Sequence, residues 1–117
     1  MNVQWQKCQG DVYCSLARLN LSSIVETSGV YIIWHAGNPG RVVRVGQGVI
    51  AERLAAHRND TQIMQFASRG DIFVTWAAVP DRQLDGVERH LAEEWNPLVG
   101  SRFPDVAPIA VNSPFAA

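Results

Sequence analysis

The sequence predicts a small α+β domain, and three observations support this fold class. Two segments rich in β-branched and aromatic residues, 29–36 and 72–79, are typical of strands. Residues 37–40 (GNPG) give a strong turn signal between the first of these and a further strand at 41–46. Apolar residues at helical spacing follow the second and third strands.

Length and composition indicate one ordinary globular domain over residues 1–117. Hydrophobic residues make up 47% of the chain and charged residues 18%, a balance typical of folded proteins. No apolar run is long enough to cross a membrane, so we expect no membrane association. The first residues lack the pattern of a signal peptide, so we expect a cytoplasmic protein.

The two cysteines, Cys8 and Cys14, are too few for a disulfide framework. We expect them to be reduced, partly buried thiols, as in most cytoplasmic proteins. A zinc site would need further ligands nearby, and none lies close in the sequence.

The charge of the chain is locally uneven. A net charge of -1 argues against a protein that coats nucleic acid through bulk positive charge. All but one of the ten cationic residues are arginine, the better bidentate partner for phosphate. The segment 41–58 holds Arg41, Arg44, Arg53 and Arg58 against only Glu52. This patch suits a site that grips one backbone segment, although each arginine alone is more typical of a solvated surface.

Residues 1–28 form an N-terminal extension that we expect to pack on a core at 29–100. Its apolar residues are compatible with either a short helix or a short strand: Leu16, Leu19, Leu21, Ile24 and Val25.

The strands at 29–36 and 41–46 are expected to form an antiparallel hairpin. The expected register joins Ala36 with Arg41, Ile33 with Arg44, and Tyr31 with Gly46. Because side chains alternate along a strand, one face would carry Tyr31, Ile33, His35, Val42 and Arg44. The hairpin therefore places a phenol beside a guanidinium.

A helix is expected from about 49 to 58, after a tight turn that Gly46 and Gly48 permit. Arg53 and His57 are four residues apart, so their side chains are neighbours on the helix surface. They flank the apolar stripe that faces the sheet. An arginine in that position is unusual unless it binds something.

The C-terminal part is expected to hold a helical turn at 63–66 and a second long helix. Asp81 is expected to cap this helix, which ends near Trp95 before Asn96 and Pro97. Its core stripe consists of Leu84, Val87, Leu91 and Trp95, and Glu88 lies at the edge of that stripe. The proline-containing tail after Gly100 is expected to be extended.

These motifs together resemble the GIY-YIG nuclease family over residues 29–100. The family's first motif corresponds to Gly29-Val30-Tyr31 and its second to Arg44-Val45-Gly46; Arg53 and His57 match the helix pair, and Glu88 precedes Pro97 by nine residues. The chain departs from the family at two positions. Arg44 replaces the second tyrosine, and Gly100 stands where an asparagine is usual.

The resemblance implies a small three-stranded antiparallel sheet flanked by helices, and hydrolysis of DNA with one divalent cation, Mg²⁺ or Mn²⁺. It implies that Glu88 binds the metal and Arg53 the phosphate oxygens, while Tyr31 takes a proton from the attacking water. Arg44 and His57 would assist Tyr31. Further phosphate or DNA contacts are expected from Arg41, Arg58, Gln47 and His35. DNA is the expected partner, with a homodimer or a separate protein for specificity.

Other interpretations remain open at this point. Glu88 could instead be a structural residue that forms an ion pair with Arg53 or Arg44. In the same way, Arg53 could form a surface ion pair with Glu52 or Asp60. Tyr31 could be an ordinary core residue. A module of the same fold that binds nucleic acid or protein without cleavage is the main competing function. A zinc hydrolase would use His90, Glu93 and Glu94, which lack the usual spacing.

Overall fold

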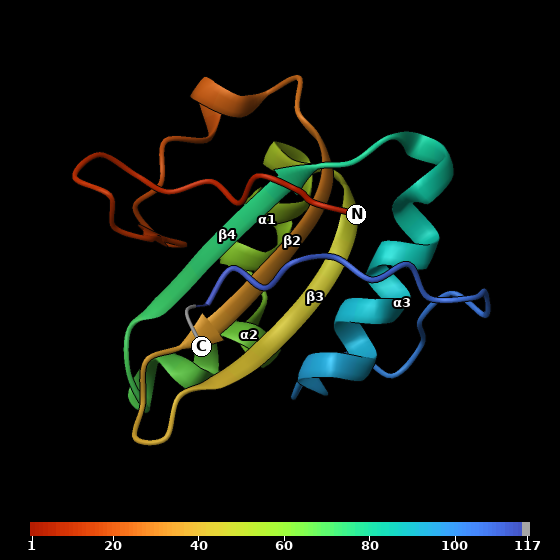
Figure 1. Ribbon diagram of the computed structural model, residues 1–117. Helices are drawn as coiled ribbons and strands as arrows, with labels where there is room; N and C mark the ends of the chain where they lie inside the picture. Colours follow the sequence, from red (N-terminus) through yellow and green to blue (C-terminus); the bar gives the residue numbers. More distant parts are fainter. Residues whose placement is uncertain (116–117) are drawn as a thin grey trace.

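The computed structural model of the protein describes residues 1–115 (Figure 1). The elements in chain order are β1 (Cys14–Ser15), η1 (Leu21–Ile24), β2 (Ser28–His35), β3 (Arg41–Val49), α1 (Ile50–Arg58), α2 (Thr61–Met64), η2 (Gln65–Ser68), β4 (Ile72–Ala78), η3 (Asp81–Gln83) and α3 (Leu84–Trp95), where η denotes a 3₁₀ helix. The predicted α+β class is confirmed. Both long helices and all three predicted strands are present within one or two residues, except that β3 continues to Val49.

The sheet has four antiparallel strands in the order β1-β4-β2-β3, so the expectation of three strands is wrong. The additional strand, β1, pairs with the outer edge of β4 through Cys14 and Ser15. A strand of two residues is too short to leave an alternating pattern in the sequence, which explains why it was not predicted. The opposite edge of the sheet is β3.

The hairpin register is confirmed at the positions that matter for the site: Tyr31 pairs with Gly46, and Ile33 pairs with Arg44. A β-bulge then shifts the pairing by one residue, so that Arg41 lies opposite His35 and the expected pair with Ala36 is wrong. Beyond the bulge Val42 pairs with Trp34 and packs on the other face of the sheet, contrary to expectation. An inserted residue of this kind leaves no signal in hydrophobic alternation.

Each face of the sheet carries its own hydrophobic core. On one face, α1 and α2 cover Tyr31 and Ile33 with the buried side chains of Ile50, Leu54 and Ile63. On the other, α3 packs Leu84, Val87 and Leu91 against Val30, Ile32 and Val45. Figure 1 shows α1 and α2 behind the sheet, while α3 and the blue C-terminal tail lie on the opposite side. We call these the α1 face and the α3 face.

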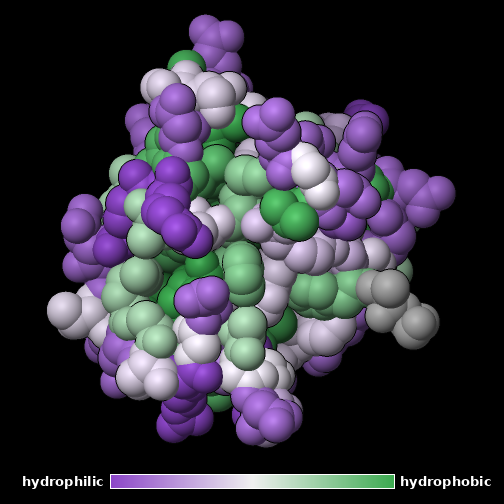
Figure 2. All heavy atoms as spheres, turned by 90° about the vertical axis from the view of Figure 1, so that its left-hand side faces the viewer, coloured by the Kyte–Doolittle hydropathy of each residue, from purple (hydrophilic) through white to green (hydrophobic). Residues whose placement is uncertain are grey.

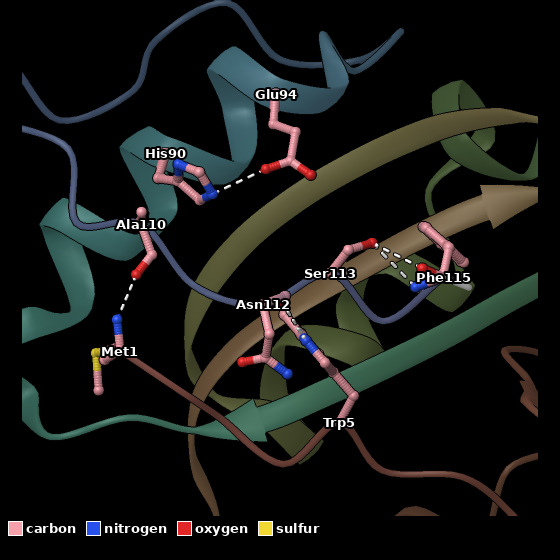
Figure 3. A network of polar contacts seen from close by, with 8 residues as sticks. All are labelled: Met1, Trp5, His90, Glu94, Ala110, Asn112, Ser113 and Phe115. Atoms are coloured by element: carbon pink, nitrogen blue, oxygen red, sulfur yellow. Dashed lines mark hydrogen bonds and ion pairs between the residues drawn. The ribbon is translucent and has the colours of Figure 1, made fainter. Parts of the chain in front are cut away.

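The N-terminal segment and the C-terminal tail lie side by side over the α3 face (Figure 3). The Met1 amino group donates to the Ala110 carbonyl oxygen at 2.7 Å, and the Trp5 indole donates to the Asn112 carbonyl oxygen at 2.8 Å. The Asn112 side chain also accepts from the Val3 backbone nitrogen at 2.7 Å. The described tail residues after α3 form no helix or strand, as the prolines predict.

Cys8 and Cys14 form a disulfide, so the expectation of free thiols is wrong. An antiparallel bridge between Cys8 and Val12 closes a turn through Gly10 and Asp11, both with positive φ. This turn brings the two cysteine Cα atoms to 5.2 Å, within the usual range for a disulfide.

Figure 2 views the molecule from the left-hand side of Figure 1, where hydrophobic residues in green appear between hydrophilic ones in purple.

The helix α3 begins differently from expectation and ends as expected. Asp81 lies in the 3₁₀ turn η3, and neither η3 nor α3 has a side-chain cap, so the predicted capping role is wrong. The helix ends at Trp95, and Asn96 takes a left-handed conformation.

Among residues 1–115, every helix falls short of the length and apolar character that a membrane crossing requires.

Candidate active site

The centre of the candidate site is a buried pair, Tyr31 and His57. The Tyr31 hydroxyl and His57 Nε2 are 2.5 Å apart, and the two residues are 0% and 6% exposed. Tyr31 lies on β2 and points across β3 toward α1, where His57 lies one turn after Arg53. A Cβ atom at Gly46 would overlap the Tyr31 hydroxyl, so a side chain at position 46 would displace the phenol.

Two arginines lie beside this pair. Arg44, on β3, extends over Gly100, where an added Cβ would lie 2.8 Å from Arg44 Nη1. Arg53, on α1, packs its aliphatic stem against Gly48. Within residues 1–115 neither arginine forms an ion pair, and Arg44 Nε is buried without a hydrogen-bond partner. The structure therefore contradicts the ion pairs considered above as an alternative to function.

Electrostatics keeps the Tyr31–His57 pair neutral at pH 7. Burial raises the pKa of Tyr31, while Arg53 and Arg44 lower it in part. Burial, together with the positive charges of Arg44 and Arg53, lowers the pKa of His57 to about 4, against the opposing effect of Asp60. The neutral imidazole can therefore accept a hydrogen bond from the phenol.

A carboxylate cluster lies next to the arginines, on the side of α3. Gln47 Nε2 donates to Glu88 Oε1 at 2.8 Å and to Asp85 Oδ1 at 2.6 Å. Burial raises the pKa of Glu88 and the charge of Asp85 adds to this effect, whereas the Gln47 hydrogen bond and both arginines oppose it. Arg44 and Arg53 thus act electrostatically on Glu88 as well as on the Tyr31–His57 pair, so the two arginines link the five predicted catalytic residues around β3.

Of the four residues expected to contact phosphate or DNA, only Gln47 joins this region, and it binds the carboxylates. Arg58 donates to the carbonyl oxygens of Leu16 and Leu19 at 2.8 and 2.7 Å, which ties α1 to the N-terminal segment. Its guanidinium is therefore engaged in holding the fold together.

The other two residues lie toward the turn of the hairpin. His35 is 2% exposed, stacks on Phe66, and accepts a hydrogen bond from Gly37, so its ring is enclosed. Arg41 is exposed and lines a pocket of about 380 Å³ together with Trp34 and Trp95. This pocket lies away from the Tyr31–His57 pair, and the chemistry of the site does not use it.

Sequence reasoning missed Asp85 and the role of Gly100. Asp85 precedes Glu88 by three residues, a spacing that places two side chains on one face of a helix. That spacing was a usable signal. No comparable signal exists for Gly100, because its contact with Arg44 depends on the path of the loop after α3.

The residues at the site fit a hard divalent cation. Residues 1–115 contain no group of three or more histidine, cysteine, aspartate or glutamate side chains that would surround a metal ion. Mg²⁺ needs no such cage, since it keeps most of its water and accepts one or two carboxylates. Glu88, with Asp85 nearby, supplies oxygen donors of this kind.

The zinc alternative does not fit the same test. His90 Nε2 lies 2.8 Å from Glu94 Oε2, and Figure 3 shows this pair on α3. Glu93 instead pairs with Arg89 at 3.2 Å. Two candidate ligands without a third do not make a zinc site.

Comparison with protein-family models, with curated proteins and with solved structures finds no match to this chain. The case for a function therefore depends on the geometry and chemistry of the site itself.

Proposed function

We propose that this protein is a divalent-metal-dependent endonuclease that hydrolyses DNA phosphodiester bonds, with a divergent GIY-YIG-like site. The observation that carries the proposal is the pair of arginines, Arg44 and Arg53. They lie beside a buried phenol–imidazole pair and, among residues 1–115, have no acidic partner. Cationic groups without an ion pair suit an anionic ligand, and a guanidinium matches phosphate geometry.

In the proposed reaction the arginines bind the non-bridging oxygens of the scissile phosphate. Their charge would then stabilise the extra negative charge of the transition state. Both positions suit this role, because Arg53 is exposed and Arg44 is half-buried. Docking of a phosphate would also offset the positive charge that lowers the pKa of His57. The imidazole would thereby become a stronger base when substrate is bound.

Proton movement follows from the short contact between the two buried side chains. The Tyr31 oxygen accepts a proton from the attacking water while its own proton passes to His57 Nε2. The water oxygen forms the new bond to phosphorus, and the bond to the leaving oxygen breaks. That leaving oxygen takes a proton from solvent, and His57 later returns its proton to solvent.

Glu88 would hold the cation, with Asp85 close by. When bound, the cation would supply charge stabilisation at the phosphate and at the leaving oxygen. Tyr31 is fully buried, so the attacking water would reach the phenol only when side chains around the hydroxyl move on substrate binding.

A second candidate is a module that binds nucleic acid or protein without cleaving it. The enclosure of Tyr31, together with the raised pKa of its hydroxyl, favours this alternative. The position of Arg44, where the family has a tyrosine, favours it as well. The two candidates share the same binding surface and differ only in turnover.

The proposed partner is DNA, contacted through its backbone, with a homodimer or a separate protein to provide sequence specificity. The site groups bind phosphate oxygens, which carry no sequence information. A cytoplasmic location also belongs to this proposal. The Cys8–Cys14 disulfide weighs against it, because such bonds persist mainly in oxidising compartments.

The test is cleavage of supercoiled, single-stranded and branched DNA in Mg²⁺ or Mn²⁺ by the full chain and three variants, Glu88→Ala, Arg53→Ala and Tyr31→Phe. We expect each variant to lose roughly 100-fold or more in rate, since each removes a group that acts in the transition state. Glu93→Ala and Arg18→Ala are the matched controls, because both residues are exposed and remote from Tyr31. They should cleave at the unsubstituted rate.

The outcomes separate the two candidates. Full activity in Glu88→Ala would end the metal-dependent assignment. If no DNA is cleaved, but salt-sensitive binding is measured and is weakened by Arg53→Ala, the non-catalytic module is the correct function. Circular dichroism of each variant establishes that a lost activity does not reflect an unfolded chain.

A further inference from the structure

We infer that Gln47 is a positioning residue: its side-chain amide, anchored on Asp85, fixes the Glu88 carboxylate where a divalent cation would bind. This inference rests on the proposed function and assigns a role to two residues that the cleavage chemistry above does not use. Gln47 was expected to contact DNA, and its observed partners give it a different role.

The geometry begins with the strand. Gln47 pairs with Val30 across the hairpin, and Val30 belongs to the core of the α3 face. The Gln47 side chain therefore lies on the side of α3, where its single amide nitrogen donates to both carboxylates. The two accepting oxygens consequently lie within about 5 Å of each other. Both acids come from the first two turns of α3.

The chemistry of an amide suits this position better than a cation would. An arginine or lysine here would neutralise Glu88 and compete with the metal ion for its oxygens. The amide of Gln47 restricts the carboxylate without cancelling its charge. It engages only Oε1, and among residues 1–115 the other oxygen, Oε2, accepts no hydrogen bond. One oxygen is thereby held while the other remains available to a cation.

Asp85 completes the arrangement by holding Gln47. The amide group has two N–H bonds, and each carboxylate accepts one of them. Asp85 is exposed, whereas Glu88 is half-buried beside Arg44. This difference assigns the anchoring role to Asp85 and the ligand role to Glu88.

The experiment measures Mn²⁺ binding to the full chain by electron paramagnetic resonance, in the absence of DNA. Gln47→Met keeps the length of the side chain and removes the donor, and Gln47→Ala removes both. We expect roughly 10-fold weaker Mn²⁺ binding in each, the usual effect of losing a group that orients a metal ligand. Gln65→Ala is the matched control, since Gln65 is exposed and its side chain donates only to the Gln62 carbonyl oxygen.

Two Asp85 variants test the anchor. Asp85→Asn retains an oxygen that accepts from Gln47, so it should weaken Mn²⁺ binding less than Asp85→Ala does. Asp85→Ala removes the acceptor and should weaken binding about as much as Gln47→Met does. In cleavage assays, Gln47→Met should need more Mg²⁺ for half-maximal rate but reach the same rate at saturation.

The failures are distinguishable. If the unsubstituted protein binds no Mn²⁺, the metal-dependent function itself is wrong. If it binds Mn²⁺ and both Gln47 variants bind equally well, only the positioning role is overturned. Equal weakening by Asp85→Asn and Asp85→Ala would make Asp85 a metal ligand and overturn its assignment as an anchor. Thermal unfolding of every variant verifies that the compared proteins are folded.

Discussion

The two faces of the sheet differ in what they bury. The α1 face encloses His35, His57 and the hydroxyl of Tyr31, whereas the α3 face buries aliphatic and aromatic side chains and the uncharged Thr75. The α1 face is also closed by a disulfide, and the α3 face by hydrogen bonds between the chain ends. The difference teaches that the α1 face holds ionisable groups inside its buried core, while the α3 face carries Glu88 half-buried at its edge.

The candidate site lies where the two faces meet, along the edge strand β3. Tyr31, His57 and Arg53 approach it from the α1 face, and Gln47 and Glu88 approach from the α3 face. A sheet of four strands has few positions where side chains from both faces can act together, and an edge is one of them. The following predictions test this division of roles, beginning with the largest effect.

The first prediction compares two leucines, one in each core. Leu54 in α1 is 0% exposed and Leu91 in α3 is 1% exposed. Replacing either by alanine should lower the free energy of unfolding by about 2 to 5 kcal/mol, because each leaves a cavity. Below the unfolding temperature, Leu54→Ala should also lose DNA cleavage, since it loosens the helix that carries Arg53 and His57. Urea unfolding and plasmid nicking measure the two effects. Full nicking activity in folded Leu54→Ala would contradict this prediction.

The second prediction concerns pH. The pKa of His57 is about 4 in the folded protein against 6.5 for a free histidine, so the unfolded chain takes up the proton first as pH falls. Stability should therefore drop between pH 6.5 and 4, by about 3 kcal/mol for this group. The lowered pKa of His35 acts in the same direction.

Urea unfolding at several pH values measures this loss. Among residues 1–115, the core of the α3 face holds no buried histidine. The loss of stability at low pH should therefore come from the histidines of the α1 face. The variant His57→Gln should show a shallower dependence on pH over this window. Identical slopes in the two proteins would show that His57 titrates normally and that the site is open to water.

The third prediction concerns the closure of the α1 face. Replacing Cys8 and Cys14 together by alanine should lower stability by about 2 kcal/mol, the effect expected for opening such a short loop. Thermal unfolding of this variant beside the oxidised protein measures the loss. Alkylation of the unreduced protein serves as the control: if both cysteines react, the disulfide is absent, and the cytoplasmic location gains support.

Much of the fold could be predicted because the relevant signals are local. The turn at 37–40 predicted the hairpin, whereas the observed pairing of Tyr31 with Gly46 also depends on the β-bulge between the turn and the site. The spacing of Arg53 and His57 placed both on one side of α1, where His57 reaches the phenol. These features depend on periods of two and four residues, which a sequence displays directly.

The remaining features depend on contacts between distant segments. The bulge that sends Val42 to the α3 face and the turn that joins Cys8 to Cys14 arise from backbone geometry without a pattern of hydrophobicity. The bond between Gln47 and Glu88 requires the placement of α3 against β3. The sequence contained the parts of the carboxylate cluster, but only the packed domain shows that one glutamine joins two acids.

The absence of a side chain at Gly46 has a consequence for how this protein can change. The Tyr31 hydroxyl occupies the space in which any larger residue at position 46 would place its first carbon. A larger residue at position 46 therefore forces the Tyr31 ring to move or to be replaced by a smaller side chain. Changes at positions 31 and 46 are thereby coupled along any route to a different chemistry.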